Sequence, residues 1–342
     1  MKTRYIASLL VLAFATAGSP AWAQAQTQDN PLGTPAAAIG KFSENYAEAV
    51  RMALPPIDSA GLAKVMERVQ AAATNSRPLA ISNSAELEKF FGLRSRNPDK
   101  SGDFVDAGDA VYRFEPQAGR LYVTWRQTDV KPVARATFAS RIKGIRASHE
   151  ALAKRLGISA DEVMFTDFRE ILTKTDRRVP ASTAATADTP IMAEGATTTM
   201  LRAVGGVLVE GSYLRVSSPD ARRMSLVKAS WPRVQLADAS ARQLRAPKDM
   251  LDEFAKRVAN DSRGVPVSVR MAVVLRPADP AKPGMYVPSL KIGVEPKAIK
   301  TADGYRTDAG MVYYSDLLKD SPAFVEASGG DTAEAEKGTA PN

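Results

Sequence analysis

The chain repeats one order of elements, a helix followed by antiparallel strands, at least twice. In the first instance a helix with apolar Ile145 and Leu156 ends at Gly157, and two alternating strand patterns follow on either side of Gly205-Gly206. The second instance begins at Pro247 and continues into further strand patterns. Units of this kind, each under about 100 residues, predict an α+β fold in which helices pack on one face of an antiparallel sheet.

Hydrophobic periodicity predicts the individual elements. Helices are expected over residues 35–52, 59–69, 85–91, 145–156 and 247–258, with Ser59 and Ser148 as N-caps. Strands are expected over residues 110–114, 121–126, 163–173, 198–204, 207–217, 224–231, 265–275, 285–294 and 311–314. Residues 176–197, which are rich in Ala, Thr and Pro, are expected to form a long loop.

These elements divide the chain into six parts. They are a signal peptide (1–25), a linker and helical segment (26–77), a small α+β hairpin module (78–145), two larger α+β modules (146–240 and 246–318) and a disordered tail (328–342).

The N-terminus has the pattern of a secretory signal peptide. Lys2 and Arg4 precede a short apolar run over residues 6–15, and small residues then allow cleavage after Ala23 or Ala25. A membrane span needs about 20 apolar residues, so this run is too short to be an anchor. The sequence therefore predicts a periplasmic or extracellular protein without a transmembrane anchor.

Composition excludes several classes of chemistry. The chain has no cysteine and one histidine, His149, which rules out disulfide scaffolds, thiol nucleophiles, Cys-ligated metals and multi-histidine metal centres. His149 lies on the apolar face of its helix, where a core residue with one hydrogen-bonded nitrogen is the expected role. No catalytic, cofactor-binding or metal-ligating residue is predicted, and no cofactor is expected.

The formal net charge of +8 is spread along the chain. Basic residues are densest at two places, around Arg141, Lys143 and Arg146, and at Arg222 and Arg223. Nucleic-acid binding requires a concentrated basic patch with aromatic residues between the cations, and the sequence does not display one. No nucleic-acid partner is predicted.

One loop gathers oxygen ligands of the kind that calcium prefers. It contains Asp99, Asp103, Asp106 and Asp109 together with two glycines. The EF-hand spacing is not met and no Glu closes the loop, so solvated turn carboxylates are the default interpretation. A calcium site is the alternative.

The stretch from Gly206 to Ser212 reads Gly-Val-x-Val-x-Gly-Ser, with Arg202 before it and Trp231-Pro232 after it. This pattern resembles the FTP and PepSY propeptide modules of secreted thermolysin-like metalloproteases. The resemblance covers residues 146–235 and, as a PepSY-like unit, residues 246–315. It implies cystatin-like modules, each with a helix packed on an antiparallel sheet. The chain lacks the zinc ligands of those proteases, so the resemblance implies a protein that binds or restrains another exported protein.

The expected function is therefore an exported, non-enzymatic binding or inhibitory protein that contacts another exported protein through sheet surfaces or edges. Two alternatives stay open: a carboxylate-dependent secreted hydrolase, and a structural or assembly component of the envelope. The sequence leaves the partner and the oligomeric state undetermined.

Overall fold

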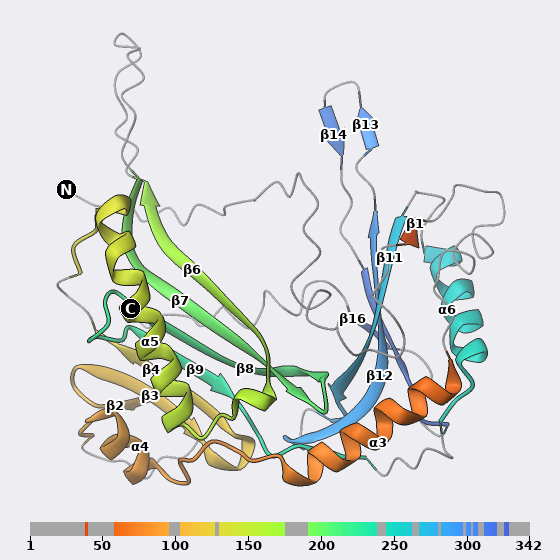
Figure 1. Ribbon diagram of the computed structural model, residues 1–342, viewed down its shortest axis with the longest axis horizontal. Coiled ribbons are helices and arrows are strands. Elements are labelled where there is room, and N and C mark those ends of the chain that lie inside the picture. Colours follow the sequence, from red (N-terminus) through yellow and green to blue (C-terminus); the bar gives the residue numbers. More distant parts are fainter. Residues whose placement is uncertain are drawn as a thin grey trace.

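A computed structural model describes residues 38–39, 58–95, 103–126, 130–174, 191–237, 244–261, 267–279, 282–296, 299–301, 304–306, 311–319 and 325–327. Over these residues a 14-stranded mixed sheet is combined with α-helices, which confirms the predicted α+β class (Figure 1). None of the described helices is both long and apolar enough to cross a membrane. The predicted signal peptide and the predicted tail lie outside the described residues.

The α-helices are α3 (Ser59–Asn75), α4 (Ser84–Phe91), α5 (Arg135–Arg155) and α6 (Pro247–Asp261), and the 3₁₀ turns are η1 (Pro116–Ala118) and η2 (Ala160–Glu162). The strands of the large sheet are β1 (Ala38–Ile39), β2 (Val105–Asp106), β3 (Ala110–Glu115), β4 (Arg120–Trp125), β5 (Val133–Ala134), β6 (Val163–Lys174), β7 (Ile191–Val204), β8 (Val207–Ser218), β9 (Leu226–Ser230), β10 (Gln235–Leu236), β11 (Val267–Pro277), β12 (Met285–Pro296), β15 (Met311–Asp316) and β16 (Val325–Ala327). A separate hairpin consists of β13 (Ile299–Thr301) and β14 (Gly304–Arg306).

Strand β8 is where the sheet divides. One edge of β8 pairs with β7. The other edge pairs with β11 in parallel at residues 208–209 and with β9 antiparallel at residues 213–217. Gly211, between these two pairings, has a φ of 71°, which bends the strand in a way that favours glycine. The sheet therefore has a first arm (β9, β4, β3 and β2) and a second arm (β11, β12, β15 and β16), which lie side by side in Figure 1.

Each arm has its own hydrophobic core. On the first arm, α4 and the C-terminal part of α5 cover one face, where Leu87 and Leu152 pack against Leu121 and Leu214. On the second arm, α3 and α6 provide the helical side of the core. The opposite face of the first arm is not covered by any of the described helices, because α4 and α5 lie on its other side and α3 and α6 belong to the second core.

The β7–β8 hairpin connects the two cores. Gly205 and Gly206 form its turn with φ values of 58° and 77°, as expected for a two-residue hairpin turn. Val207 and Val209 then enter the core of the second arm, as their alternation predicts. Upstream on β7, Arg202 is buried with its guanidinium 4.8 Å from the ring centroid of Trp231. The residues that carry the propeptide resemblance therefore surround the division of the sheet.

Most of the predicted elements are present. The predicted strands correspond to β3, β4, β6, β7, β8, β9, β11, β12 and β15, and the helices predicted at 59–69, 85–91 and 247–258 correspond to α3, α4 and α6. The predicted cap Ser59 is wrong, because Asp58 caps α3 by accepting hydrogen bonds from the backbone of Ala60 and Gly61. Ser148 is not a cap either. Helix α5 already begins at Arg135, and the Ser148 hydroxyl donates to the carbonyl of Ile145 at 2.8 Å.

Two predictions from local pattern are wrong. Ala38 and Ile39, predicted as helix within 35–52, pair with Val269 and Ser268 of β11 as a strand, since a sheet edge can override local periodicity. The remainder of that predicted helix lies outside the described residues. The predicted loop 176–197 is strand from residue 191 onward.

The small side chains that suggested a loop are needed in β7 for packing. Ala193 and Ala196 are buried against α5. A Cβ at Gly195 would lie 2.6 Å from the carbonyl oxygen of Ser218, so the strand accepts only glycine there without a backbone shift.

Candidate functional site

A row of four side chains crosses the uncovered face of the first arm. Arg113 of β3 lies opposite Tyr122 of β4, and Tyr122 lies opposite Lys228 of β9. Lys228 in turn lies opposite Arg215 of β8. Neighbouring strands are about 4.8 Å apart, so this row extends roughly 14 Å across the sheet.

A second row runs parallel to the first. It places Glu115 opposite Arg120, Arg120 opposite Ser230, and Ser230 opposite Tyr213. Because side chains alternate between the two faces of a strand, the same strands send their intervening apolar residues into the core beneath α4 and α5. The two rows therefore lie on the solvent side of a sheet whose other side is packed.

Aromatic side chains lie among the cations of these rows. Phe104, which precedes β2, is 61% exposed and packs edge-to-face on Tyr122 with ring centroids 5.8 Å apart. The guanidinium of Arg113 lies 5.9 Å from the Phe104 centroid, and the ammonium of Lys228 lies 6.0 Å from that of Tyr213. These distances are at the outer range of cation–π interactions.

The face has an excess of positive charge. Its cations are Arg113, Arg120, Arg215 and Lys228, whereas Glu115 is its one carboxylate among the described residues that line it. Glu115 forms ion pairs with Arg113 at 2.6 Å and with Arg120 at 3.5 Å. The resulting groove has a volume of about 730 Å³. We refer to Phe104, Arg113, Glu115, Arg120, Tyr122, Tyr213, Arg215, Lys228 and Ser230 as the basic sheet face.

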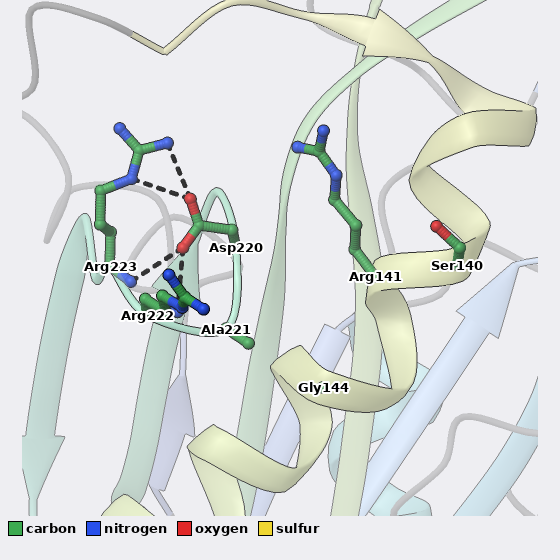
Figure 2. Close-up of a pocket in the computed structure, with 7 residues that line it drawn as sticks. All are labelled: Ser140, Arg141, Gly144, Asp220, Ala221, Arg222 and Arg223. Atoms are coloured by element: carbon green, nitrogen blue, oxygen red, sulfur yellow. Dashed lines mark hydrogen bonds and ion pairs between the residues drawn. The ribbon is translucent and has the colours of Figure 1, made fainter.

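A second groove lies between α5 and the loop that joins β8 to β9 (Figure 2). It has a volume of about 810 Å³. We call it the arginine groove, and its lining includes Ser140, Arg141, Gly144, Asp220, Arg222 and Arg223. The structure thus brings together the two densest basic segments of the sequence, one from α5 and one from the loop.

His149 is a buried core residue, as predicted. Both of its ring nitrogens are hydrogen-bonded rather than one: Nδ1 lies 2.7 Å from the Thr198 hydroxyl, and Nε2 lies 2.8 Å from the Ser218 hydroxyl. Burial lowers the pKa of His149 to about 4, so the ring is neutral at physiological pH. The Thr198 and Ser218 hydroxyls are also buried, so these three side chains link α5 to β7 and β8 and do not face a groove.

The aspartates that suggested calcium are only partly described. Asp99 lies outside the described residues. Asp106 accepts hydrogen bonds from the guanidinium of Arg126 at 2.7 Å and from the backbone of Gly108 at 2.8 Å. Asp106 thereby joins the turn between β2 and β3 to the residue that follows β4. Among the residues that the structure describes, no three acidic or histidine side chains are grouped closely enough to hold a metal ion.

No protein-family model matches the chain, and neither does any curated protein or solved structure. The site therefore has to be interpreted from its own geometry. Sequence reasoning missed the basic sheet face because its members are spread between Phe104 and Ser230 and meet only through strand pairing. The one available signal was their alternation with core residues in four strands.

Proposed function

We propose that the protein is an exported, non-enzymatic binding protein that holds an acidic, extended segment of another exported protein on its basic sheet face. The observation that carries this proposal is the cross-strand row in which Lys228 lies directly opposite Arg215. Like charges directly opposite each other are unfavourable in a sheet. A bound acidic segment would place carboxylates beside both cations.

The composition of the face favours a protein partner. Tyr and Arg are enriched in the energetically dominant positions of protein interfaces, and Phe104, Tyr122 and Tyr213 supply rigid contact area between the cations. A single-stranded nucleic acid would instead need ring faces on which bases can stack. The cations near the rings of Phe104 and Tyr213 lie at 5.9 and 6.0 Å, at the outer range of cation–π contact, and single-stranded DNA is therefore the competing ligand tested below.

The propeptide resemblance supports the same function. Its motif occupies the first half of β8, and the same strand then places Tyr213 and Arg215 on the basic sheet face. FTP and PepSY modules restrain an exported protease, and we propose a related role for this chain, with cystatin-like use of a sheet surface. This face does not support the hydrolase alternative. Glu115 is ion-paired with two arginines and faces no second carboxylate among the residues lining the groove.

A displayed library of random dodecapeptides tests the proposal. The library is selected in parallel against the wild-type protein and against the double variant Arg215→Gln, Lys228→Gln. We expect the wild type to enrich peptides with clustered Asp and Glu, and the double variant to lose this enrichment. Enrichment without an acidic excess, or equal enrichment by both proteins, would contradict the proposal.

A labelled single-stranded DNA dodecamer is measured alongside. If it binds the wild type more tightly than any selected peptide and the double variant releases it, the ligand is nucleic acid and the protein-partner proposal is wrong.

A further inference from the structure

The arginine groove is independent of the basic sheet face. It lies beside α5, which packs on the opposite side of the sheet. Figure 2 shows Arg141 extending from α5, and Arg222 and Arg223 extending from the loop around Asp220. Three guanidinium groups from two separate segments thus line one depression of the surface.

Asp220 organises the loop. One of its carboxylate oxygens accepts hydrogen bonds from the backbone N–H groups of Arg222 at 2.9 Å and Arg223 at 3.0 Å. The other accepts from Nε of Arg223 at 2.8 Å. Burial raises the pKa of Asp220, but these hydrogen bonds lower it, and the balance leaves the pKa below its ordinary value. The carboxylate is therefore charged, and its acceptor sites are occupied by the loop itself.

The remaining two arginines have no such partner. Figure 2 marks no hydrogen bond or ion pair between the guanidinium group of Arg141 or Arg222 and the other residues drawn in the groove. Among the described residues that line the groove, Asp220 is the one carboxylate and it pairs with Arg223, so Arg141 and Arg222 bring two positive charges without a counter-charge in this lining. A phosphate monoester or inorganic phosphate carries about −1.5 to −2 charges near pH 7, which matches this excess.

The separation of the two segments is fixed by a close contact. A Cβ at Gly144 of α5 would lie 3.2 Å from the Cβ of Ala221, so the helix and the loop pack directly against each other below the guanidinium groups. Arginine presents a planar fork of donors that pairs with phosphate oxygens two at a time. Two such forks, one from each wall of the groove, can pair with the oxygens of one tetrahedral oxyanion.

We propose that the arginine groove binds a phosphate group through Arg141 and Arg222, with Arg223 held in place by Asp220. The phosphate comes either from inorganic phosphate or from a phosphomonoester lipid headgroup such as that of phosphatidic acid, since both present terminal phosphate oxygens with close to two negative charges. This site is additional to the peptide-binding face, and neither proposal depends on the other.

The test uses the full-length mature protein and two probes. Isothermal titration with inorganic phosphate, in chloride buffer at about 0.15 M ionic strength, measures binding of the ion. Flotation with vesicles of phosphatidic acid and phosphatidylcholine, against vesicles of phosphatidylcholine alone, measures binding of the headgroup. Both are repeated with Arg141→Gln, with Arg222→Gln and with the control Lys143→Gln, which removes an exposed cation of the same helix outside the groove.

We expect the wild type to bind one of the two probes, each groove variant to weaken that binding at least tenfold, and Lys143→Gln to change it less than twofold. Binding of phosphate alone identifies the free ion as the ligand, and binding of the anionic vesicles alone identifies the headgroup. The proposal is overturned if the wild type binds neither probe, if the groove variants bind as well as the wild type, or if Lys143→Gln weakens binding equally.

Discussion

Lys228 of β9 and Arg215 of β8 lie directly opposite each other on the uncovered face of the first arm, at the end of a row that begins at Arg113. A sheet is stabilised by opposite charges or by aromatic and β-branched pairs at such positions, and it is destabilised by two cations. Residues that break a local rule of stability mark places where a protein has a different task. The pair is therefore the feature on which the proposed binding face rests.

If Lys228 serves binding and not the fold, Lys228→Gln should leave the stability of the protein nearly unchanged. The substitution removes the repulsion with Arg215 and also the weak contact with the Tyr213 ring, and each contribution is below about 1 kcal/mol. The free energy of unfolding, measured by urea denaturation, should change by less than about 1 kcal/mol. A loss of more than about 2 kcal/mol would mean that Lys228 is a structural residue.

The turn between β7 and β8 offers a matched pair of glycine substitutions. Gly206→Ala should cost about 1 kcal/mol, because its φ is positive but a Cβ would meet no atom closer than 3.8 Å. Gly205→Ala should cost clearly more, about 3 kcal/mol, because a Cβ there would lie 2.9 Å from the backbone of Arg68 and Val69 in α3. Equal losses in denaturant titrations would show that α3 does not pack on this turn.

The buried, neutral His149 should make the stability of the fold depend on pH. Its pKa is about 4 in the folded protein and 6.5 when unperturbed, so the unfolded chain takes up a proton first as the pH falls. The contribution of neutral His149 is complete above about pH 6.5 and is lost progressively toward pH 4, by about 3 kcal/mol in all. In His149→Gln this part of the acid dependence should disappear, although the variant starts from a lower stability at pH 7. An unchanged slope between pH 6.5 and pH 4 would contradict the buried, neutral assignment.

The buried ion pair of Arg202 with Glu162 should make the fold sensitive to the loss of the Glu162 charge. Its fully buried guanidinium contacts Glu162 at 2.7 Å, and the indole N–H of Trp231 donates to the same carboxylate at 3.1 Å. Glu162→Gln should lower the free energy of unfolding by about 3 kcal/mol, because the guanidinium then remains buried without a carboxylate. Trp231 fluorescence should shift as its partner changes. The neighbouring Asp161→Asn, an exposed carboxylate, is the control and should cost less than about 0.5 kcal/mol.

Much of the fold could be predicted because many elements carry a strong period. The stripe of α6 and the alternation of β8 match the buried residues Met250, Phe254, Val207 and Val209. The start of α5 could not be predicted, because Ala134 precedes the helix and makes no side-chain cap. The part of the helix before Ile145 also shows little contrast between an apolar and a polar face. The N-terminal part of β7 was missed for a related reason. Its Ala and Gly residues are dictated by the closeness of α5 and of Ser218, which only the tertiary structure reveals.

The candidate site was less accessible to sequence reasoning than the fold. Tyr122 and Arg215 are 93 positions apart in the chain, and their shared face follows from the register of β4 with β9 and of β9 with β8. Arg141 and Arg222 were visible as dense basic segments, but their common groove depends on the contact of α5 with the loop at Gly144. Local patterns identify which side chains leave the core, whereas strand register and helix docking decide which of them meet.

The most direct test of the central claim is the dissociation constant of a selected acidic peptide, measured by fluorescence anisotropy for the wild type, Lys228→Glu and the control Lys154→Glu. Lys154 is an exposed residue of α5, which covers the other side of the sheet, so its reversal changes the net charge equally without touching the face. If the basic sheet face is the binding site, Lys228→Glu raises the dissociation constant at least tenfold and Lys154→Glu changes it less than threefold. Equal effects of the two reversals, or tight binding by Lys228→Glu, would contradict the account.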